Sequence, residues 1–216
     1  MTSAVRTRKD PRRETTRVAL IEAAEALFAD AGIEAVSLRQ IGAATGALNT
    51  NVVAYHFGGK DALIEAVFHH RLPQIDARRG ELLERAETAG ECTIPSLLRV
   101  FALPLFEQTD AGGKHSFALF LTALERSGMT AARGLVMDDY PFSERVTRLL
   151  IGLLPSNIRF EGGRRMRLVV SLLSTALQII DRDGPGSAEA AARQFDTAIT
   201  MAAAAFAASS EEGIIP

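Results

Sequence analysis

The sequence has little of several residue types on which other protein classes depend. Its 216 residues include a single cysteine, Cys92, and no tryptophan. One cysteine excludes an intramolecular disulfide and a cysteine-rich zinc site. The longest uncharged stretches, 168–180 and 197–210, are shorter than the roughly 18–20 apolar residues that a membrane-spanning helix needs. The basic N-terminus also has no apolar run behind it, as a signal peptide would, and we expect a cytoplasmic protein.

Strand patterns are missing as well. No sustained alternation of apolar and polar residues occurs, whereas apolar residues recur at helical spacing along the whole chain. The apolar share of 47% is enough for a sizeable core. Glycine and proline punctuation places the later helices near 94–109, 114–127, 141–154, 161–181 and 187–209. The sequence therefore predicts an all-α fold.

Charge is distributed unevenly. The chain has a net charge of −2, but residues 1–17 carry six basic and two acidic side chains, a local charge of +4. A basic segment on an acidic body indicates a polyanionic partner at that end. A solvated tail is the alternative interpretation.

The first 60 residues predict three helices. The first begins at Asp10-Pro11, with Asp as N-cap and Pro at the first position, and ends at Gly32. Ser37 and Gln40 have the spacing of a capping box, which opens a second helix ending at about residue 45. Gly46 ends the second helix, and Asn49 is suited to cap a third helix over 50–57.

A fourth helix is expected from about residue 60 to 89, with a kink or restart at Pro73. Two short helices around a glycine turn, braced by a longer first helix, are typical of a helix-turn-helix unit. Such a unit seats its second helix in the major groove of DNA.

Residues at the start of the third helix suit contacts with bases. Asn49 and Asn51 can pair with adenine through two hydrogen bonds, and Thr50 can pack on a thymine methyl. Capping and turn roles are the alternative for all three. Tyr55 and His56, at the far end of that helix, can donate to backbone phosphates.

Lys60 stands where a cation is otherwise unfavourable. A positive charge at a helix N-terminus opposes the helix dipole, and Lys60 opens the fourth helix. Backbone N–H groups at a helix N-terminus together with a lysine form a phosphate site. We therefore expect Lys60 to hold a DNA phosphate, although an exposed lysine of no consequence is the alternative.

Residues 12–68 resemble the DNA-binding domain of the TetR/AcrR family of bacterial repressors. The residues that carry the resemblance are Ala23, Ala24, Leu27, Phe28, Gly32, Ser37, Ile41, Gly46, Tyr55, His56, Phe57, Gly58, Lys60 and Leu63. The resemblance implies that Ser37 and Arg39 lie at the DNA backbone or groove. It also implies that residues 49–51 face bases, and that Tyr55, His56 and Lys60 hold phosphates.

The sequence departs from the family pattern at two points. Gly42 follows Ile41 where the family usually has alanine, a change that costs a helix about 1 kcal/mol. The family's usual tyrosine stands two residues before the histidine, whereas here Tyr55 directly precedes His56, and the preceding span is one residue longer. This extra residue bears on which of residues 49–51 contacts the first base.

The resulting domain organisation has three parts. We expect a basic arm over 1–11, a DNA-binding domain over 12–68 with its motif at about 37–57, and a helical regulatory and dimerisation domain over 69–216. The resemblance implies a homodimer through the helices near 161–181 and 187–209. The sequence supports this, because 168–180 is apolar on almost every side and 198–208 is rich in alanine. A buried core helix is the alternative.

Aromatic and methionine side chains gather in the middle of the chain. Such a set can line a ligand cavity between helices, although it can equally form plain core. The candidate ligand-binding residues are Phe101, Phe106, Phe117, Phe120, Met137 and Tyr140. Together with the resemblance, these features predict a sequence-specific transcriptional regulator without a cofactor that binds double-stranded operator DNA. The resemblance implies a repressor, with an activator as the alternative, and we expect a small apolar or aromatic effector to release it from the DNA.

Two other function classes stay open. Glu65 and His69 share a helix face and could chelate a metal, but no third ligand is in view and no metal site is expected. The alternatives are an all-α enzyme, a lyase or hydrolase, and a helical protein-interaction module. Failure to bind any DNA at low salt would favour either of them.

Overall fold

The computed structural model describes residues 11–49, 51–129, 139–184 and 186–209, and this part of the chain contains helices and no strand. The predicted all-α fold is confirmed. The α-helices are α1 (Pro11–Ala31), α2 (Leu38–Ala44), α3 (Val52–Phe57), α4 (Lys60–Ala89), α5 (Ile94–Glu107), α6 (Ser116–Ser127), α8 (Pro141–Gly152), α9 (Gly162–Asp183) and α10 (Ala188–Ala207), and a short 3₁₀ turn, η1 (Arg159–Glu161), precedes α9.

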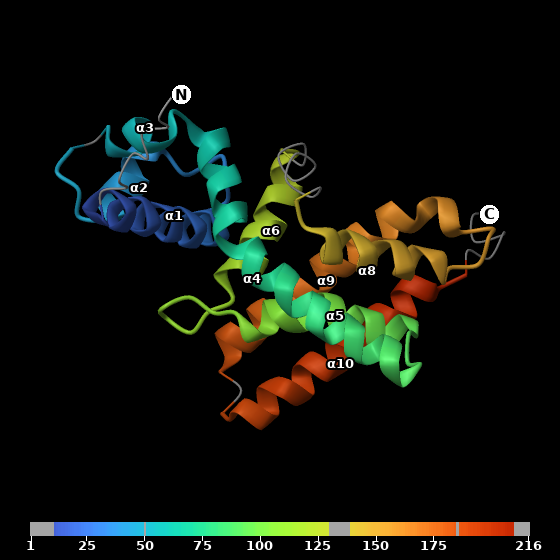
Figure 1. The fold of residues 1–216 in the computed structure, drawn as a ribbon. Helices are drawn as coiled ribbons and strands as arrows, with labels where there is room; N and C mark the ends of the chain where they lie inside the picture. The colour runs from blue at the N-terminus through green and yellow to red at the C-terminus, as the bar shows by residue number, and fades with distance from the viewer. Residues whose placement is uncertain (1–10, 50, 130–138, 185, 210–216) are drawn as a thin grey trace, which may run out of the picture.

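The helices α1, α2 and α3 form a head at one end of the molecule (Figure 1). The head folds around apolar side chains that α1 presents at helical spacing, among them Leu20, Ala24 and Phe28, all fully buried. The predicted capping box opens α2: Ser37 Oγ accepts from the Gln40 amide, and Gln40 Oε1 accepts from the Ser37 amide at 2.8 Å. These local hydrogen bonds fix where α2 begins.

Gly42 allows α2 and α3 to approach closely. A Cβ atom at this position would lie 3.1 Å from Val52 Cγ1, closer than ordinary van der Waals contact. The residue that departs from the family pattern therefore sits where the two helices of the motif touch. Its low helix propensity is offset by this packing.

The long helix α4 connects the head to the rest of the chain (Figure 1). It runs from Lys60 to Ala89 without ending at Pro73, so of the predicted kink or restart the restart is wrong, and the kink stays a prediction. Pro73 lies on an exposed side of α4, where water can satisfy the carbonyl that its missing N–H leaves unpaired. The domain boundary expected at residue 68 therefore falls inside a continuous helix.

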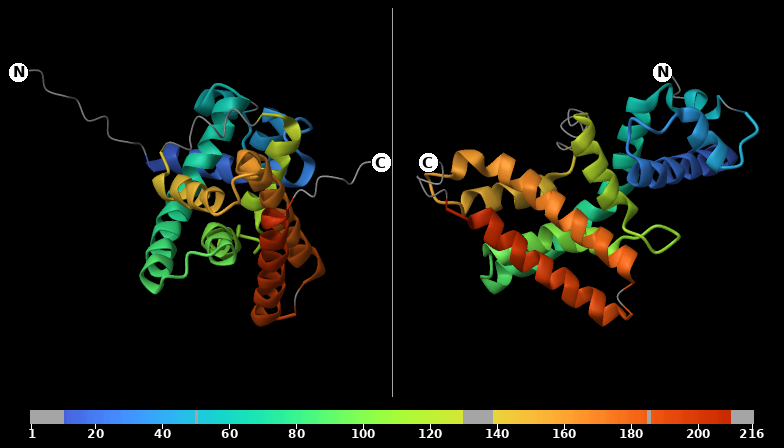
Figure 2. Two further views of the ribbon diagram at one scale, coloured as in Figure 1. Left: turned by 90° about the vertical axis from the view of Figure 1, so that its right-hand side faces the viewer. Right: turned by 180° about the vertical axis from the view of Figure 1, so that it is seen from behind.

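The helices from α5 to α10 form the body, and their ends lie within two residues of the predicted ranges. The helices α9 and α10 lie side by side along one flank of the body (Figures 1 and 2). Leu173 and Leu177 of α9 and Phe206 of α10 are buried. Among the described residues, no helix is long and apolar enough to cross a membrane.

A buried polar cluster ties α4 to α8. Asp76 Oδ1 accepts from the Ser143 amide at 2.7 Å and from the Ser143 hydroxyl at 2.6 Å, so it caps the start of α8. Arg79 donates to Ser143 Oγ at 2.7 Å and to the Phe101 carbonyl. Asp76, Arg79 and Ser143 thus satisfy one another's polar groups, as burial requires.

Candidate nucleic-acid interface and body groove

The start of α3 differs from the predicted one by two residues. The helix begins at Val52, and its N-cap is Asn51, whose side chain makes no capping hydrogen bond. Asn49 Oδ1 instead accepts from the Asn51 amide at 2.9 Å, a local turn that competes with the capping role. The prediction that Asn49 caps a helix from residue 50 is therefore wrong. Thr50 lies outside the described residues.

This corner of the head presents side chains to solvent. Asn49 and Asn51 are exposed, Leu48 beside them is 102% exposed, and Tyr55 on the next turn is 69% exposed. A large apolar side chain held fully in water is a mark of an interaction surface when others adjoin it. Sequence reasoning missed Leu48. The available signal was a large apolar residue in the turn between the second and third helices.

Arginines of α1 stack on the aromatic rings of α3. The Arg13 guanidinium lies 5.4 Å from the centre of the Tyr55 ring, and that of Arg17 lies 5.2 Å from the centre of the Phe57 ring. A guanidinium over an aromatic face is attracted by the ring and still presents N–H donors at its edge. The charge pattern of residues 1–17 indicated a basic end, but only the fold places these two arginines beside α3.

The charges of the same two arginines affect the pKa of His56. Burial lowers the pKa of His56 below its ordinary value, and the positive charges of Arg13 and Arg17 lower it further. The imidazole is therefore neutral in the free protein at pH 7, with one N–H to donate. A phosphate at this position would oppose the field of the arginines.

Lys60 and Ser37 both have partners within the head. Lys60 Nζ donates to the Ile33 carbonyl at 2.8 Å, and an ammonium group has three donors, so two are left for an anion. The Ser37 hydroxyl is held 2.7 Å from Gln40 Oε1, which leaves its oxygen committed to the cap of α2. Arg39 is exposed on α2.

Two of the predicted ligand residues join the head to the body instead of lining the groove described below. Phe120 packs against Phe28 of α1, with 6.2 Å between ring centres, and against Phe68 of α4, with 5.5 Å. Phe117 also packs edge-on to Phe68. Phe120 is completely buried. These rings form what we call the aromatic junction: Phe28, Phe68, Phe117 and Phe120.

The remaining predicted ligand residues lie in separate places. Phe101 packs under the Arg79 guanidinium, 4.2 Å from it, and Phe106 stacks on Phe195 of α10 with 4.6 Å between ring centres. The Tyr140 hydroxyl lies 3.0 Å from His69 Nδ1. Met137 lies outside the described residues. The structure thus does not gather these side chains around one described cavity.

The pairing of Glu65 with His69 gains no further ligand from the fold. His69 uses a ring nitrogen on Tyr140. Within the described ranges, no group of three or more His, Cys, Asp or Glu side chains is placed to hold a metal ion.

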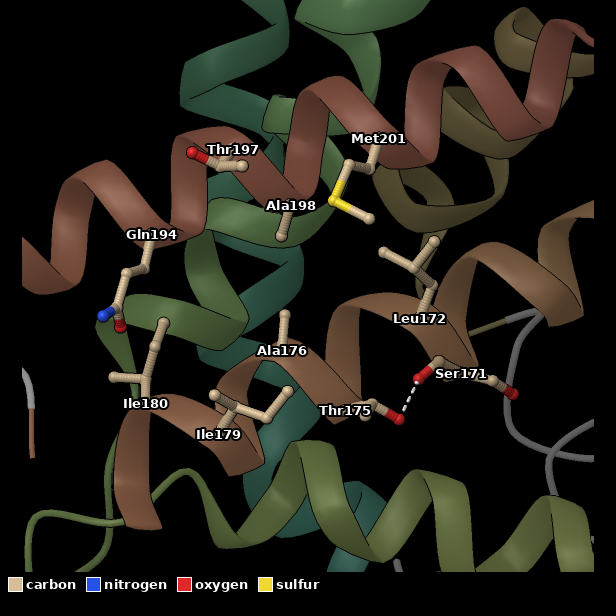
Figure 3. Close-up of a pocket in the computed structure, with 10 residues that line it drawn as sticks. All are labelled: Ser171, Leu172, Thr175, Ala176, Ile179, Ile180, Gln194, Thr197, Ala198 and Met201. Carbon is tan, nitrogen blue, oxygen red and sulfur yellow. Dashed lines mark hydrogen bonds between the residues drawn. The ribbon is translucent and has the colours of Figure 1, made fainter. Parts of the chain in front are cut away.

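An apolar groove of about 590 Å³ runs between α9 and α10. Figure 3 shows Ala176 and Ala198 pointing toward one another across it, with longer side chains at its rim. Ile179 is 42% exposed and Met201 is 59% exposed. The lining residues are Ser171, Leu172, Thr175, Ala176, Ile179, Ile180, Gln194, Thr197, Ala198 and Met201. None of the aromatic residues predicted to bind a ligand lines this groove.

Comparison with known proteins places the head within a family. Residues 20–67 match the family model of bacterial regulatory proteins of the tetR family. None of the curated proteins matches the chain. The matched segment begins within α1, includes α2 and α3, and ends within α4.

Proposed function

This chain is a member of the tetR family of bacterial regulatory proteins and hence a DNA-binding transcriptional regulator, and we propose that it is a homodimeric repressor. It binds operator DNA and leaves it when a small apolar or aromatic molecule binds. The observation that carries the proposal is the family match over residues 20–67, which coincides with an exposed polar corner flanked by cations.

We assign the base contacts to the start of α3. Asn51, at the first position outside the helix, and Asn49, two residues before it, present amides that can pair with adenine. Thr50, between them in the sequence, belongs to the same base-contacting set. Leu48, exposed beside them, is suited to pack on a thymine methyl or a sugar.

The phosphate contacts surround the base contacts. Tyr55 and His56 stand in the last turn of α3, and Lys60 stands at the N-terminus of α4, where the helix dipole favours an anion. Ser37 and Arg39 approach the backbone from α2. Arg13 and Arg17 extend this cationic rim, because their stacking on α3 fixes their position relative to it.

The three-part organisation has residues 1–11 as a DNA-contacting arm, 12–68 as the DNA-binding domain and 69–216 as the regulatory and dimerisation domain. Because α4 spans the last boundary as one helix, a change in the body is transmitted to the head through a rigid element. This continuity supports control of DNA binding by the body.

The groove between α9 and α10 is the surface for a second copy of this chain. Its lining is mainly apolar with small residues at its centre, which lets helices of a partner approach closely. Leu168, 67% exposed, extends the same apolar surface along α9. Dimerisation also suits DNA recognition, since two heads can occupy half-sites about 34–36 Å apart.

The aromatic junction supports release by an apolar effector. Phe117 and Phe120 of α6 hold the rings of Phe28 and Phe68. A small apolar or aromatic molecule that inserted among these rings would displace the head from the body. Phe101, Phe106 and Tyr140 are further candidate contacts for such a molecule, as is Met137, which lies outside the described residues.

Selection of bound duplexes from random DNA tests the proposal. We expect the full-length chain to enrich a two-fold symmetric sequence, and an apolar or aromatic compound to lower its affinity for that sequence. Failure to bind any duplex at low salt would overturn the proposal and favour an all-α enzyme, for which turnover of candidate substrates is the test. Compounds that bind the protein and leave its DNA affinity unchanged would overturn the release step.

A further inference from the structure

Two buried polar clusters meet at adjacent residues at the start of α6. The first joins three helices through Glu25 of α1, which is 1% exposed. Arg71 of α4 donates to both carboxylate oxygens of Glu25, from Nε at 2.6 Å and from a terminal nitrogen at 3.0 Å. Ser116 Oγ of α6 donates to the same carboxylate.

The second cluster joins α6 to α9. The His115 amide donates to Asp181 Oδ2 at 2.9 Å, and His115 Nδ1 lies 2.6 Å from Asp181 Oδ1. His115 Nε2 lies 3.0 Å from the Phe106 carbonyl. Both ring nitrogens therefore lie within hydrogen-bond distance of oxygens from other helices. The two side chains are 6% and 8% exposed.

The clusters form one continuous path from the head to the helix that lines the groove. Asp181 lies one residue beyond Ile180, which lines the groove on α9. His115 and Ser116 are neighbours in the chain, and Glu25 belongs to the head. Figure 1 shows α6 between the head and the helices of the body.

These polar contacts fix the orientation of the head relative to the body, which the apolar contacts beside them do not. Apolar burial is non-directional, so the rings of the aromatic junction hold the head against the body without fixing its angle. A bidentate pair between a guanidinium and a carboxylate is directional. Buried charges also tolerate little displacement, because a charge that loses its partner away from water is strongly destabilised.

We propose that Glu25, Arg71, Ser116, His115 and Asp181 are positioning residues that fix the angle of the head relative to the α9 face. In the dimer they thereby set the half-site spacing that two heads accept. The inference rests on the proposed homodimeric DNA binding. Each added base pair moves one half-site by about 3.4 Å along the duplex and about 35° around it, so a fixed head discriminates strongly between spacings.

The test measures spacing preference apart from affinity. The selected operator is prepared with its central spacer shortened or lengthened by about one or two base pairs, together with a duplex that holds a single half-site. Two conservative variants interrupt the path: Ser116→Ala removes the hydroxyl donor to Glu25, and Asp181→Asn removes the charge opposite His115 with its shape kept. Ser127→Ala in α6 and Asp196→Asn in α10 are matched controls.

For the wild type and both controls we expect a sharp optimum in spacing. For Ser116→Ala and Asp181→Asn we expect the ratio between optimal and shifted operators to fall by at least about fivefold, the lower end of typical coupling between sites, with single half-site affinity unchanged. If the wild type binds no duplex, the proposed function fails. If it binds and both variants keep the wild-type ratio, the positioning role is overturned.

A loss confined to folding is distinguished in the same experiment. Variants that lose single half-site affinity as much as operator affinity would show that the path supports the head itself. That outcome also overturns the positioning role. Melting temperatures of all five proteins, wild type and four variants, accompany the binding data.

Discussion

In the part of the chain that the structure describes, the head and the body each present an exposed surface, and the two surfaces differ in chemistry. On the head, Asn49 and Asn51 are exposed just before α3, and two arginines of α1 stack on the rings of α3. On the body, the groove between α9 and α10 is lined mainly by apolar and small side chains. A polar, cationic surface suits a polyanion, whereas an apolar groove suits another protein surface.

The two surfaces also indicate how DNA binding by the head depends on dimerisation of the body. A head alone can contact only one half-site, whereas the proposed two-fold operator holds two. In the proposed dimer, association through the groove would make the second contact intramolecular and raise the overall affinity without any new DNA contact. The two surfaces therefore predict different failures when each is altered.

The largest effect is expected from a charge placed in the groove. In Ile179→Glu the new carboxylate would lose water when a second copy docks, so we expect a monomer by sedimentation. The affinity for the two-fold operator should fall about 100-fold or more as avidity is lost, with single half-site binding retained.

Gln178→Glu is the matched control for that variant. It adds the same charge at the neighbouring position, which is exposed and does not line the groove. A monomeric Gln178→Glu, or a dimeric Ile179→Glu, would contradict the assignment of the groove.

If Asn51 contacts a base, its replacement should change the DNA sequence that the protein prefers. Asn51→Ala removes an amide that pairs with adenine through two hydrogen bonds, which costs about 1–3 kcal/mol against the correct base. We expect repeated selection to show a relaxed preference at one position of each half-site. Asn157→Ala, an exposed asparagine of the body, should leave the selected sequence as it is.

Phosphate contact by Lys60 predicts weaker binding without a change of preference. Lys60→Ala should reduce affinity for every duplex and lower the slope of log affinity against log salt by about 1. Lys114→Ala, in the exposed loop before α6, should change neither quantity. If Asn51→Ala and Lys60→Ala both weaken all sequences uniformly, Asn51 does not contact a base.

The smallest effect is expected from pH. Burial and then Arg13 and Arg17 hold the pKa of His56 below 6.5 in the free protein, and nearby phosphates would raise it. The DNA complex then binds a proton more tightly than the free protein does. Affinity should therefore rise as pH falls through the pKa of the complex and level off below that of the free protein.

His56→Gln should remove this part of the pH dependence, since glutamine donates a hydrogen bond and does not titrate. His69→Gln, which changes a histidine bonded to Tyr140 in the body, is the control. An unchanged pH profile in His56→Gln would show that His56 does not lie near a phosphate.

Several features of the head were predictable because they depend on residues close together in the chain. The capping box of Ser37 and Gln40 spans three residues, and its hydrogen bonds are those expected. The same locality explains the error at α3, because Asn49 is equally suited to a short turn with Asn51 and makes that turn instead. Local patterns therefore predict which helices form better than they predict the residue at which each helix begins.

The candidate site of the body was predicted less well. Phe117 and Phe120 have the composition of a ligand pocket, yet they pack against Phe28 and Phe68 at the aromatic junction. Composition does not distinguish a cavity from a filled core, because both require the same apolar side chains. Which rings meet depends on how α6 lies against α1 and α4.

The sequence by itself determined the helical fold, the motif around Gly46 and the family of the head, because helical periodicity, caps and motif spacing are encoded locally. Only the tertiary structure decided which distant charges meet. Glu25 and Arg71 stand 46 residues apart and His115 and Asp181 stand 66 apart, and no local pattern pairs them. Their pairing follows from packing three helices around α6, which depends on the whole core at once.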